Sequence, residues 1–225
     1  MRIHEAFLRV RGYPTKNKNV MEESVNTCFE CGSTFNRLPV IGEEVHDFTL
    51  SVFQNNDIRD DVKLSSYRGK WLVLFFYPAD FTFVCPTELE ELADHYEKFQ
   101  ALDAEIVSVS TDTAFTHKAW HDKSPAISKI TYPMAADPTG QLAKYFGVYI
   151  ESEGLALRGT FIIDPDGKLA AYEVNNNDIG RSATELLRKL EAAKFVREHE
   201  GMVCPASWKP GDDTLTPGVD LVGKI

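Results

Sequence analysis

The chain has 225 residues, a formal net charge of −10 and a pI of about 5.1. An acidic chain lacks the basic face that phosphate binding requires, so nucleic acid is excluded as the main partner. Hydrophobic residues make up 43% of the chain, enough for a sizeable core, yet the longest apolar run is far too short to cross a membrane. We therefore expect a globular protein with no nucleic-acid and no membrane partner.

Four cysteines are too few for a disulfide scaffold in a chain of this length: Cys28, Cys31, Cys85 and Cys204. Residues 1–11 lack the apolar segment of a secretory signal, so we expect a reducing, cytoplasmic location where disulfides are transient and catalytic. Two other interpretations of the start stay open. It could be a basic transit segment, or Met21 could be the true start, with upstream or disordered residues before it.

The first predicted elements follow an irregular stretch, residues 1–37. A short strand is expected at Asp47–Leu50, and a polar loop from Gln54 to Asp61. A turn or short helix is predicted at Ser65–Lys70. The apolar run Trp71–Tyr77 is continuous and flanked by turn signals, which is typical of a strand buried on both faces.

Helices and strands then alternate along the chain. Pro86 fits the first position of a helix, and apolar residues follow it at helical spacing as far as Phe99. The later predicted elements are a strand at Glu105–Ser110, a helix capped by Thr111–Thr113 and running to about Asp122, a helix opened by Asp137–Gly140, a hairpin of Thr160–Ile163 and Leu169–Val174, and a helix at Ser182–His199. The Pro- and Gly-rich end, Gly201–Ile225, is expected to be extended.

This order of elements predicts an α/β fold with a mixed central sheet flanked by helices. Residues 38–199 show no repeat and no clear linker, so we expect them to form one domain. An N-terminal extension, residues 1–37, and a C-terminal arm, residues 200–225, complete the predicted organisation.

Cys85 is the strongest candidate for chemistry because it follows a buried strand and precedes a helix. The N–H groups of the helix start point toward a sulfur placed there and favour its thiolate, which is a nucleophile. Thr82 can present a hydroxyl to whatever meets that sulfur. The plain alternatives are a buried hydrophobic role for Cys85, a surface salt bridge for Arg158 and an inert thiol for Cys204.

Three other groups have weaker signals. The Cys28–Cys31 pair could be an idle or weakly metal-binding pair, an accessory dithiol or half of a zinc site. His117 and His121 are four residues apart on one predicted helix, which fits a metal pair but is more typical of an ordinary helix face. We interpret the acidic run Glu88–Glu91 as the usual preference of carboxylates for a helix start.

The segment Tyr77–Glu88, Tyr-Pro-Ala-Asp-Phe-Thr-Phe-Val-Cys-Pro-Thr-Glu, resembles the active-site signature of the peroxiredoxins. Other segments similar to that family follow in the same order: His117–His121, Asp137–Gly140, Gly154–Phe161, Val203–Ala206 and Asp220–Ile225. The resemblance covers about Leu38–Ile225 and is greatest to typical two-cysteine peroxiredoxins of the bacterial alkyl hydroperoxide reductase type. It implies a thioredoxin-like fold with additional elements.

The resemblance also implies roles for individual residues. Cys85 is implied as the peroxidatic cysteine, whose thiolate attacks a peroxide and becomes a sulfenic acid. Pro78, Thr82 and Arg158 are implied as the residues that complete its site, and Arg181 as a second arginine nearby.

Cys204 is implied as the resolving cysteine, which forms a disulfide with Cys85 of a neighbouring subunit. The activity implied is thiol-dependent reduction of hydrogen peroxide and organic hydroperoxides, with no metal, haem or flavin in this chain. The implied partners are the peroxide, an external dithiol reductant (thioredoxin or a flavoprotein disulfide reductase), and further copies of the chain in a homodimer or a ring of five dimers.

Two other functions stay open at this point. One is a chaperone or redox-signalling protein built on the same assembly. The other is a general disulfide oxidoreductase, which would need a second cysteine at the helix start, where this chain has Pro86-Thr87-Glu88 after Cys85.

Overall fold

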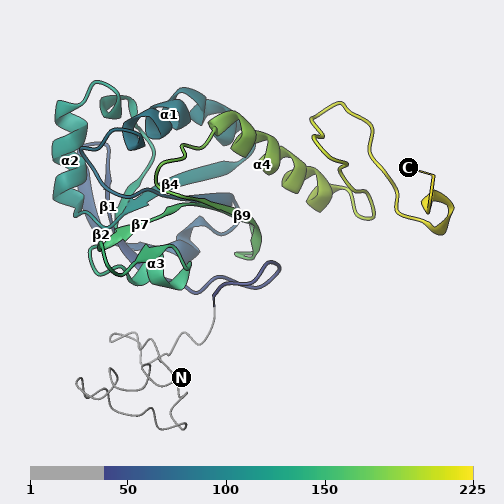
Figure 1. Ribbon diagram of the computed structural model, residues 1–225, viewed down its shortest axis with the longest axis horizontal. Coiled ribbons are helices and arrows are strands. Elements are labelled where there is room, and N and C mark those ends of the chain that lie inside the picture. Colours follow the sequence, from purple (N-terminus) through teal and green to yellow (C-terminus); the bar gives the residue numbers. More distant parts are fainter. Residues whose placement is uncertain (1–37, 225) are drawn as a thin grey trace, which may run out of the picture. The chain divides into compact units, whose positions relative to one another are not determined.

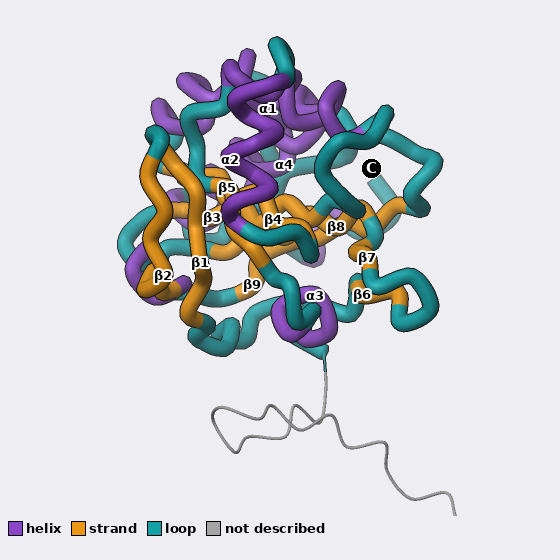
Figure 2. The backbone as a smooth tube through the Cα atoms, turned by 90° about the vertical axis from the view of Figure 1, so that its left-hand side faces the viewer, coloured by secondary structure: helices purple, strands orange, loops and turns teal. Residues whose placement is uncertain are grey.

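The computed structural model describes residues 38–224, so the expectations for the N-terminal extension and for the Cys28–Cys31 pair lie outside the described residues. Within this range the chain folds around β3 (Trp71–Phe76), all of whose residues are buried. Its continuous apolar sequence is therefore explained by burial of both faces of the strand, as predicted. Figure 1 shows a central sheet with helices packed on both sides, and Figure 2 labels β3 within it.

The central sheet has seven strands, in the spatial order β2 (Asp57–Lys63), β1 (Thr49–Gln54), β5 (Met134–Ala136), β4 (Ala104–Ser110), β3, β8 (Arg158–Ile163) and β9 (Leu169–Asn175). The pairs β3–β4 and β4–β5 are parallel, and the other four are antiparallel. The prediction of a mixed sheet in an α/β fold is thus confirmed. A two-stranded sheet of β6 (Tyr149–Ile150) and β7 (Leu155–Ala156) lies apart from it.

Helices α1 (Cys85–Ala101), α2 (Ala114–Lys123) and α4 (Ala183–Glu198) cover one face of the sheet, and α3 (Gln141–Tyr145) lies on the other (Figures 1 and 2). Alternate residues of β3 serve the two faces, as strand geometry requires. Val73 and Phe75 join the core formed with α1 and α4, whereas the Phe76 ring contacts Phe146 and Phe161 on the α3 side. Three short 3₁₀ turns complete the elements: η1 (Leu64–Tyr67), η2 (Ile127–Lys129) and η3 (Val219–Leu221).

The polar loop expected from Gln54 to Asp61 is wrong, because this segment contains most of β2. Asn55 and Asn56 have φ values of 52° and 61°, which turn the chain tightly back on itself. Two consecutive residues with positive φ are typical of a two-residue hairpin turn, and Asn tolerates that conformation well. Since β2 is an edge strand with mostly exposed side chains, it lacks the apolar alternation that would have revealed it.

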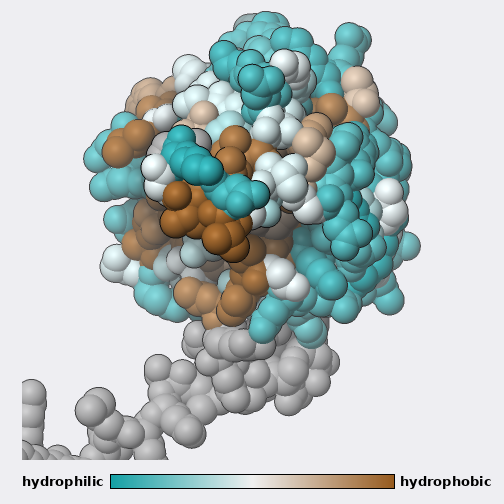
Figure 3. Space-filling model, turned by 90° about the vertical axis from the view of Figure 1, so that its right-hand side faces the viewer, coloured by the Kyte–Doolittle hydropathy of each residue, from teal (hydrophilic) through white to brown (hydrophobic). Residues whose placement is uncertain are grey.

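The C-terminal arm turns back toward α4. The Trp208 carbonyl accepts a hydrogen bond from Arg188, and the Trp208 ring lies 4.9 Å from that of Phe195. The arm also exposes apolar side chains: Val219 and Val222 are 89% and 79% exposed. Figure 3, which faces this end of the chain, shows hydrophobic side chains gathered there. Among residues 38–224, no helix combines the length and apolar character needed to cross a bilayer.

Candidate active site

Cys85 is the first residue of α1, at the end of the loop that follows β3, and its side chain is fully buried. This is the strand-to-helix corner that the sequence predicts. The helix begins one residue earlier than predicted, so Pro86 is its second residue, still within the first turn, where a residue without an N–H group costs no hydrogen bond. The positive end of α1 therefore lies beside the sulfur, and the protein around it excludes bulk water.

Arg158 brings a positive charge to the sulfur. It is the first residue of β8, which pairs directly with β3, and the side chain is almost completely buried. Its Nη1 lies 3.4 Å from the Cys85 Sγ, and its Nε donates a hydrogen bond to the Asn177 carbonyl. This placement rules out the surface salt bridge that was the plain alternative for this residue.

Glu88 links two buried arginines. Its carboxylate accepts a 2.6 Å hydrogen bond from Arg158 Nη1, and from Arg181 it accepts bonds of 2.8 Å and 2.9 Å from the backbone N and from Nε. Burial lowers the pKa of Arg181, and the Glu88 carboxylate opposes that shift. The Arg181 guanidinium also lies over the Phe75 ring, 3.4 Å from its centre.

Glu88 lies in the first turn of α1, as the interpretation of helix-start chemistry expects, but that interpretation does not include its contacts with the two arginines. The side chain is only 3% exposed and serves as the shared counter-ion of Arg158 and Arg181. Two guanidinium groups against one carboxylate leave a net positive charge around the sulfur, which favours an anion there. The sequence contains one signal for this role. Glu88 is three residues after Cys85 on the same helix, and residues at that spacing lie on the same helix face.

Pro78 and Thr82 belong to the loop that carries Cys85. Pro78 is buried and Thr82 is partly buried. The Thr82 hydroxyl donates a 2.9 Å hydrogen bond to the Ala79 carbonyl. Its proton is committed within the loop, so toward a bound molecule the oxygen acts as an acceptor.

His117 and His121, which fit a metal pair but are more typical of an ordinary helix face, have different hydrogen-bond partners. His117 is fully buried and His121 partly buried, and they contact different backbone carbonyls, those of Ala135 and Ile130. Over residues 38–224, no cluster of three or more His, Cys, Asp or Glu side chains could hold a metal ion.

Cys204 lies on the C-terminal arm, beside α4. Its Sγ is 3.9 Å from the Ala192 carbonyl, and the side chain is partly buried. Burial raises the pKa of the Cys204 thiol, while the nearby Arg188 charge acts in the opposite direction. Cys85 and Cys204 are both free thiols, with no disulfide between them in this chain.

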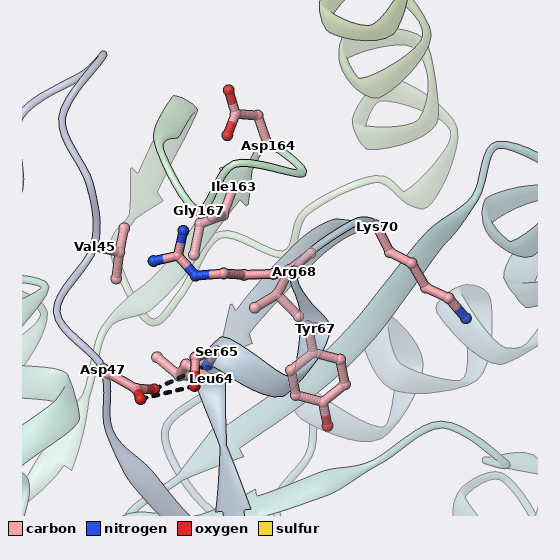
Figure 4. A pocket seen from close by; sticks show the side chains of 11 residues that line it. Val45, Asp47, Leu64, Ser65, Tyr67, Arg68, Lys70, Ile163, Asp164 and Gly167 are labelled. Carbon is pink, nitrogen blue, oxygen red and sulfur yellow. Dashed lines mark hydrogen bonds between the residues drawn. The ribbon is translucent and has the colours of Figure 1, made fainter.

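A small cavity at the opposite end of β3 has no part in this site. It lies between η1 and the turn before β9, and its lining includes Arg68 and Asp164 (Figure 4). The carboxylate of Asp47, which also lines the cavity, accepts hydrogen bonds from Ser65. Its volume of about 20 Å³ is enough for one water molecule and too small for a substrate.

A buried cysteine at a helix start with an arginine against its sulfur, on a mixed sheet flanked by helices, defines a thiol-based redox enzyme of thioredoxin-like fold. Residues 41–172 match the model of the AhpC/TSA family, and residues 192–223 match the C-terminal domain of 1-Cys peroxiredoxin. The chain belongs to the AhpC/TSA family of peroxiredoxins.

Relatives of known identity agree with this assignment. The chain is 52% identical over 188 residues to alkyl hydroperoxide reductase C of Salmonella typhimurium, covering 84% of this chain and all of that protein. The same identity is found over 189 residues with alkyl hydroperoxide reductase C of Staphylococcus saprophyticus, again covering 84% of this chain and all of the relative.

Solved structures extend the likeness to the fold. AhpC of Enterococcus faecalis superimposes with a TM-score of 0.72 at 48% identity, covering 75% of this chain and all of that one. The reduced 2-Cys peroxiredoxin of Plasmodium vivax superimposes with a TM-score of 0.74 at 33% identity, covering 77% of this chain and 91% of that one. The expected thioredoxin-like peroxiredoxin fold is confirmed.

Proposed function

We propose that this protein is a thiol-dependent peroxidase that reduces hydrogen peroxide and organic hydroperoxides, with Cys85 as the attacking thiolate. The observation that carries the proposal is the contact of 3.4 Å between Cys85 Sγ and Arg158 Nη1 inside a buried site. A buried sulfur with a guanidinium beside it is suited to nucleophilic attack rather than to packing alone. The names of the relatives, alkyl hydroperoxide reductase C, support the same activity.

The chemistry is a displacement at oxygen. The Cys85 thiolate attacks one peroxide oxygen, the O–O bond breaks, and the other oxygen leaves as water or an alcohol after taking a proton. Arg158 donates hydrogen bonds where negative charge grows on the leaving oxygen, which lowers the barrier most. Thr82 accepts a hydrogen bond from the attacked hydroperoxide O–H, and Pro78 shields the sulfur from water. Arg181 holds Glu88, which in turn orients Arg158.

Cys204 completes the cycle as the resolving cysteine. Its thiol attacks the Cys85 sulfenic acid of a neighbouring subunit, so a disulfide forms and water leaves. The apolar surface of the arm supports an association between copies, since large exposed apolar patches mark interaction sites. An apolar hollow of about 330 Å³ lies on the same arm, lined by residues that include Val203, Leu215 and Val222.

The assembly and its partners follow from this cycle. A homodimer is the unit that pairs Cys85 with Cys204, and a ring of five such dimers is the proposed assembly. An external dithiol protein, thioredoxin or a flavoprotein disulfide reductase, returns the disulfide to two thiols in the cytoplasm. Residues 38–199 form the catalytic domain, residues 200–225 the arm that carries the resolving thiol, and residues 1–37 an extension.

One experiment tests both cysteine roles together. Wild-type protein treated with one equivalent of peroxide should run as a covalent dimer on non-reducing electrophoresis. The Cys204→Ser variant should consume the same single equivalent but give no dimer band, because the proposed resolving thiol is missing. The Cys85→Ser variant should consume none. A dimer band that persists in Cys204→Ser, or wild-type protein that leaves the peroxide untouched, would overturn the proposal.

A further inference from the structure

A buried polar cluster of Tyr77, Asp80 and His117 lies at the start of the loop that carries Cys85. The Asp80 carboxylate accepts a 2.7 Å hydrogen bond from the Tyr77 hydroxyl through Oδ1, and a 2.8 Å bond from His117 Nδ1 through Oδ2. The side chains of Asp80 and His117 are both fully buried. His117 Nε2 lies 3.1 Å from the Ala135 carbonyl, on β5. The peroxide chemistry proposed above uses none of these groups.

Each member of the cluster has a defined role in hydrogen bonding. Both ring nitrogens of His117 lie within hydrogen-bond distance of an oxygen atom, Nδ1 of the Asp80 carboxylate and Nε2 of the Ala135 carbonyl. Burial and the Asp80 charge raise the pKa of Tyr77 well above its usual range, so its hydroxyl stays a donor. Asp112 accepts a 2.8 Å bond from the Asp80 backbone N–H. The start of the loop is thus fixed to β3, α2 and the end of β4.

The next residue along the loop is held in an unfavourable conformation. Phe81 has a φ of 54°, a value that a bulky aromatic residue adopts only when its surroundings hold it there. Its ring lies 5.9 Å from that of Trp120, which is three residues after His117 on α2. Helix α2 therefore holds the loop at two successive residues, Asp80 and Phe81.

The cycle proposed above requires this loop to open. The Cys85 side chain is fully buried, and a second sulfur must come within about 2.05 Å of Sγ to form a disulfide. A sulfur on another polypeptide cannot reach that distance while the loop and the start of α1 cover the site. A group that stabilises the closed loop therefore slows disulfide formation and prolongs the life of the sulfenic acid.

We propose that Asp80 and His117 form a buried latch that holds the Cys85 loop closed and so sets how fast the oxidised site can open for disulfide formation. Both are positioning residues that act through the backbone of the loop and do not touch the peroxide. The latch rests on the proposed peroxidase function, because it has a consequence only where Cys85 alternates between a closed and an open site. Its strength decides how long the sulfenic acid is exposed to a second peroxide.

The test separates two rate constants in the full-length protein by rapid quenching. One is the second-order rate constant for loss of the Cys85 thiol with hydrogen peroxide, and the other is the first-order rate constant for the Cys85–Cys204 cross-link. In His117→Gln, cross-linking should be about tenfold faster than in wild type, while thiol loss is no faster. Less sulfinic acid should form on Cys85 at excess peroxide. General damage to the site would slow both steps.

His121→Gln is the matched control. His121 lies on the same helix and also contacts a backbone carbonyl, that of Ile130, but its ring packs on Phe53 on β1. Both of its rate constants should equal those of wild type. Tyr77→Phe, which removes one hydroxyl from the cluster, replaces His117→Gln in the test if that variant does not fold. The rate constant for cross-linking in Tyr77→Phe should exceed that in His121→Gln.

The latch is overturned if cross-linking in both His117→Gln and Tyr77→Phe matches the His121→Gln control, or if it is slower. That result differs from a failure of the proposed function, in which wild-type protein itself shows no loss of the Cys85 thiol with peroxide.

Discussion

Replacing Arg158 by methionine is expected to lower the second-order rate constant for the reaction of Cys85 with hydrogen peroxide by about 10²–10³-fold, the usual cost of losing one donor to a developing oxyanion. The variant loses the guanidinium whose Nη1 lies 3.4 Å from the sulfur. Thiolate and leaving oxygen both lose their nearest fixed positive charge, while the flexible methionine side chain keeps the apolar part of the packing. Stopped-flow kinetics of the reduced protein would measure the change.

Arg197→Met is the matched control for this prediction. Arg197 pairs with Asp164 and Asp166 at the surface, remote from the sulfur, and its replacement should leave the rate constant unchanged. An Arg158→Met enzyme that reacts as fast as Arg197→Met would show that the guanidinium has no part in the chemistry.

Replacing Glu88 by glutamine is expected to reduce the free energy of unfolding by about 3–5 kcal/mol, the range found when one partner of a buried ion pair is removed. The carboxylate binds both Arg158 and Arg181, and all three side chains are nearly inaccessible to solvent. Without it, two buried guanidinium groups face each other with no counter-ion. Denaturant titration at one fixed protein concentration would measure the loss.

Glu90→Gln provides the comparison on the same helix. Glu90 pairs with Lys129 at the surface, with more than a third of its side chain exposed, and pairs of this kind contribute little. Its replacement should leave the denaturation midpoint close to that of wild type. If Glu88→Gln unfolds at the same midpoint as Glu90→Gln, the carboxylate between the arginines is not the structural link described here.

The sequence predicts best those elements whose pattern reflects burial. The apolar run of β3 and the capped start of α2 at Thr113 are both where the sequence places them. The corner at Cys85 follows from a buried strand that leads to a proline in the first turn of a helix. Each of these signals is local, so a single sequence contains it in full.

The elements that were missed depend on tertiary contacts. β5 (Met134–Ala136) has three residues, too few for any periodicity, and exists because it fits between β1 and β4. The role of Glu88 depends on Arg158 and Arg181, which are 70 and 93 residues away along the chain. The roles of Cys85, Cys204, Thr82, Pro78, Arg158 and Arg181 in turnover stay predictions from the resemblance, supported by the geometry around the sulfur.

Chemical trapping of the oxidised sulfur tests the central claim most directly. The reduced Cys204→Ser variant would receive one equivalent of hydrogen peroxide, followed by a reagent that reacts only with sulfenic acids, and peptide mass spectrometry would locate the adduct. We predict a single adduct on Cys85, in proportion to the peroxide consumed. Peroxide that disappears without an adduct on Cys85, or an adduct on another residue, would contradict the assignment of this buried thiolate as the group that breaks the O–O bond.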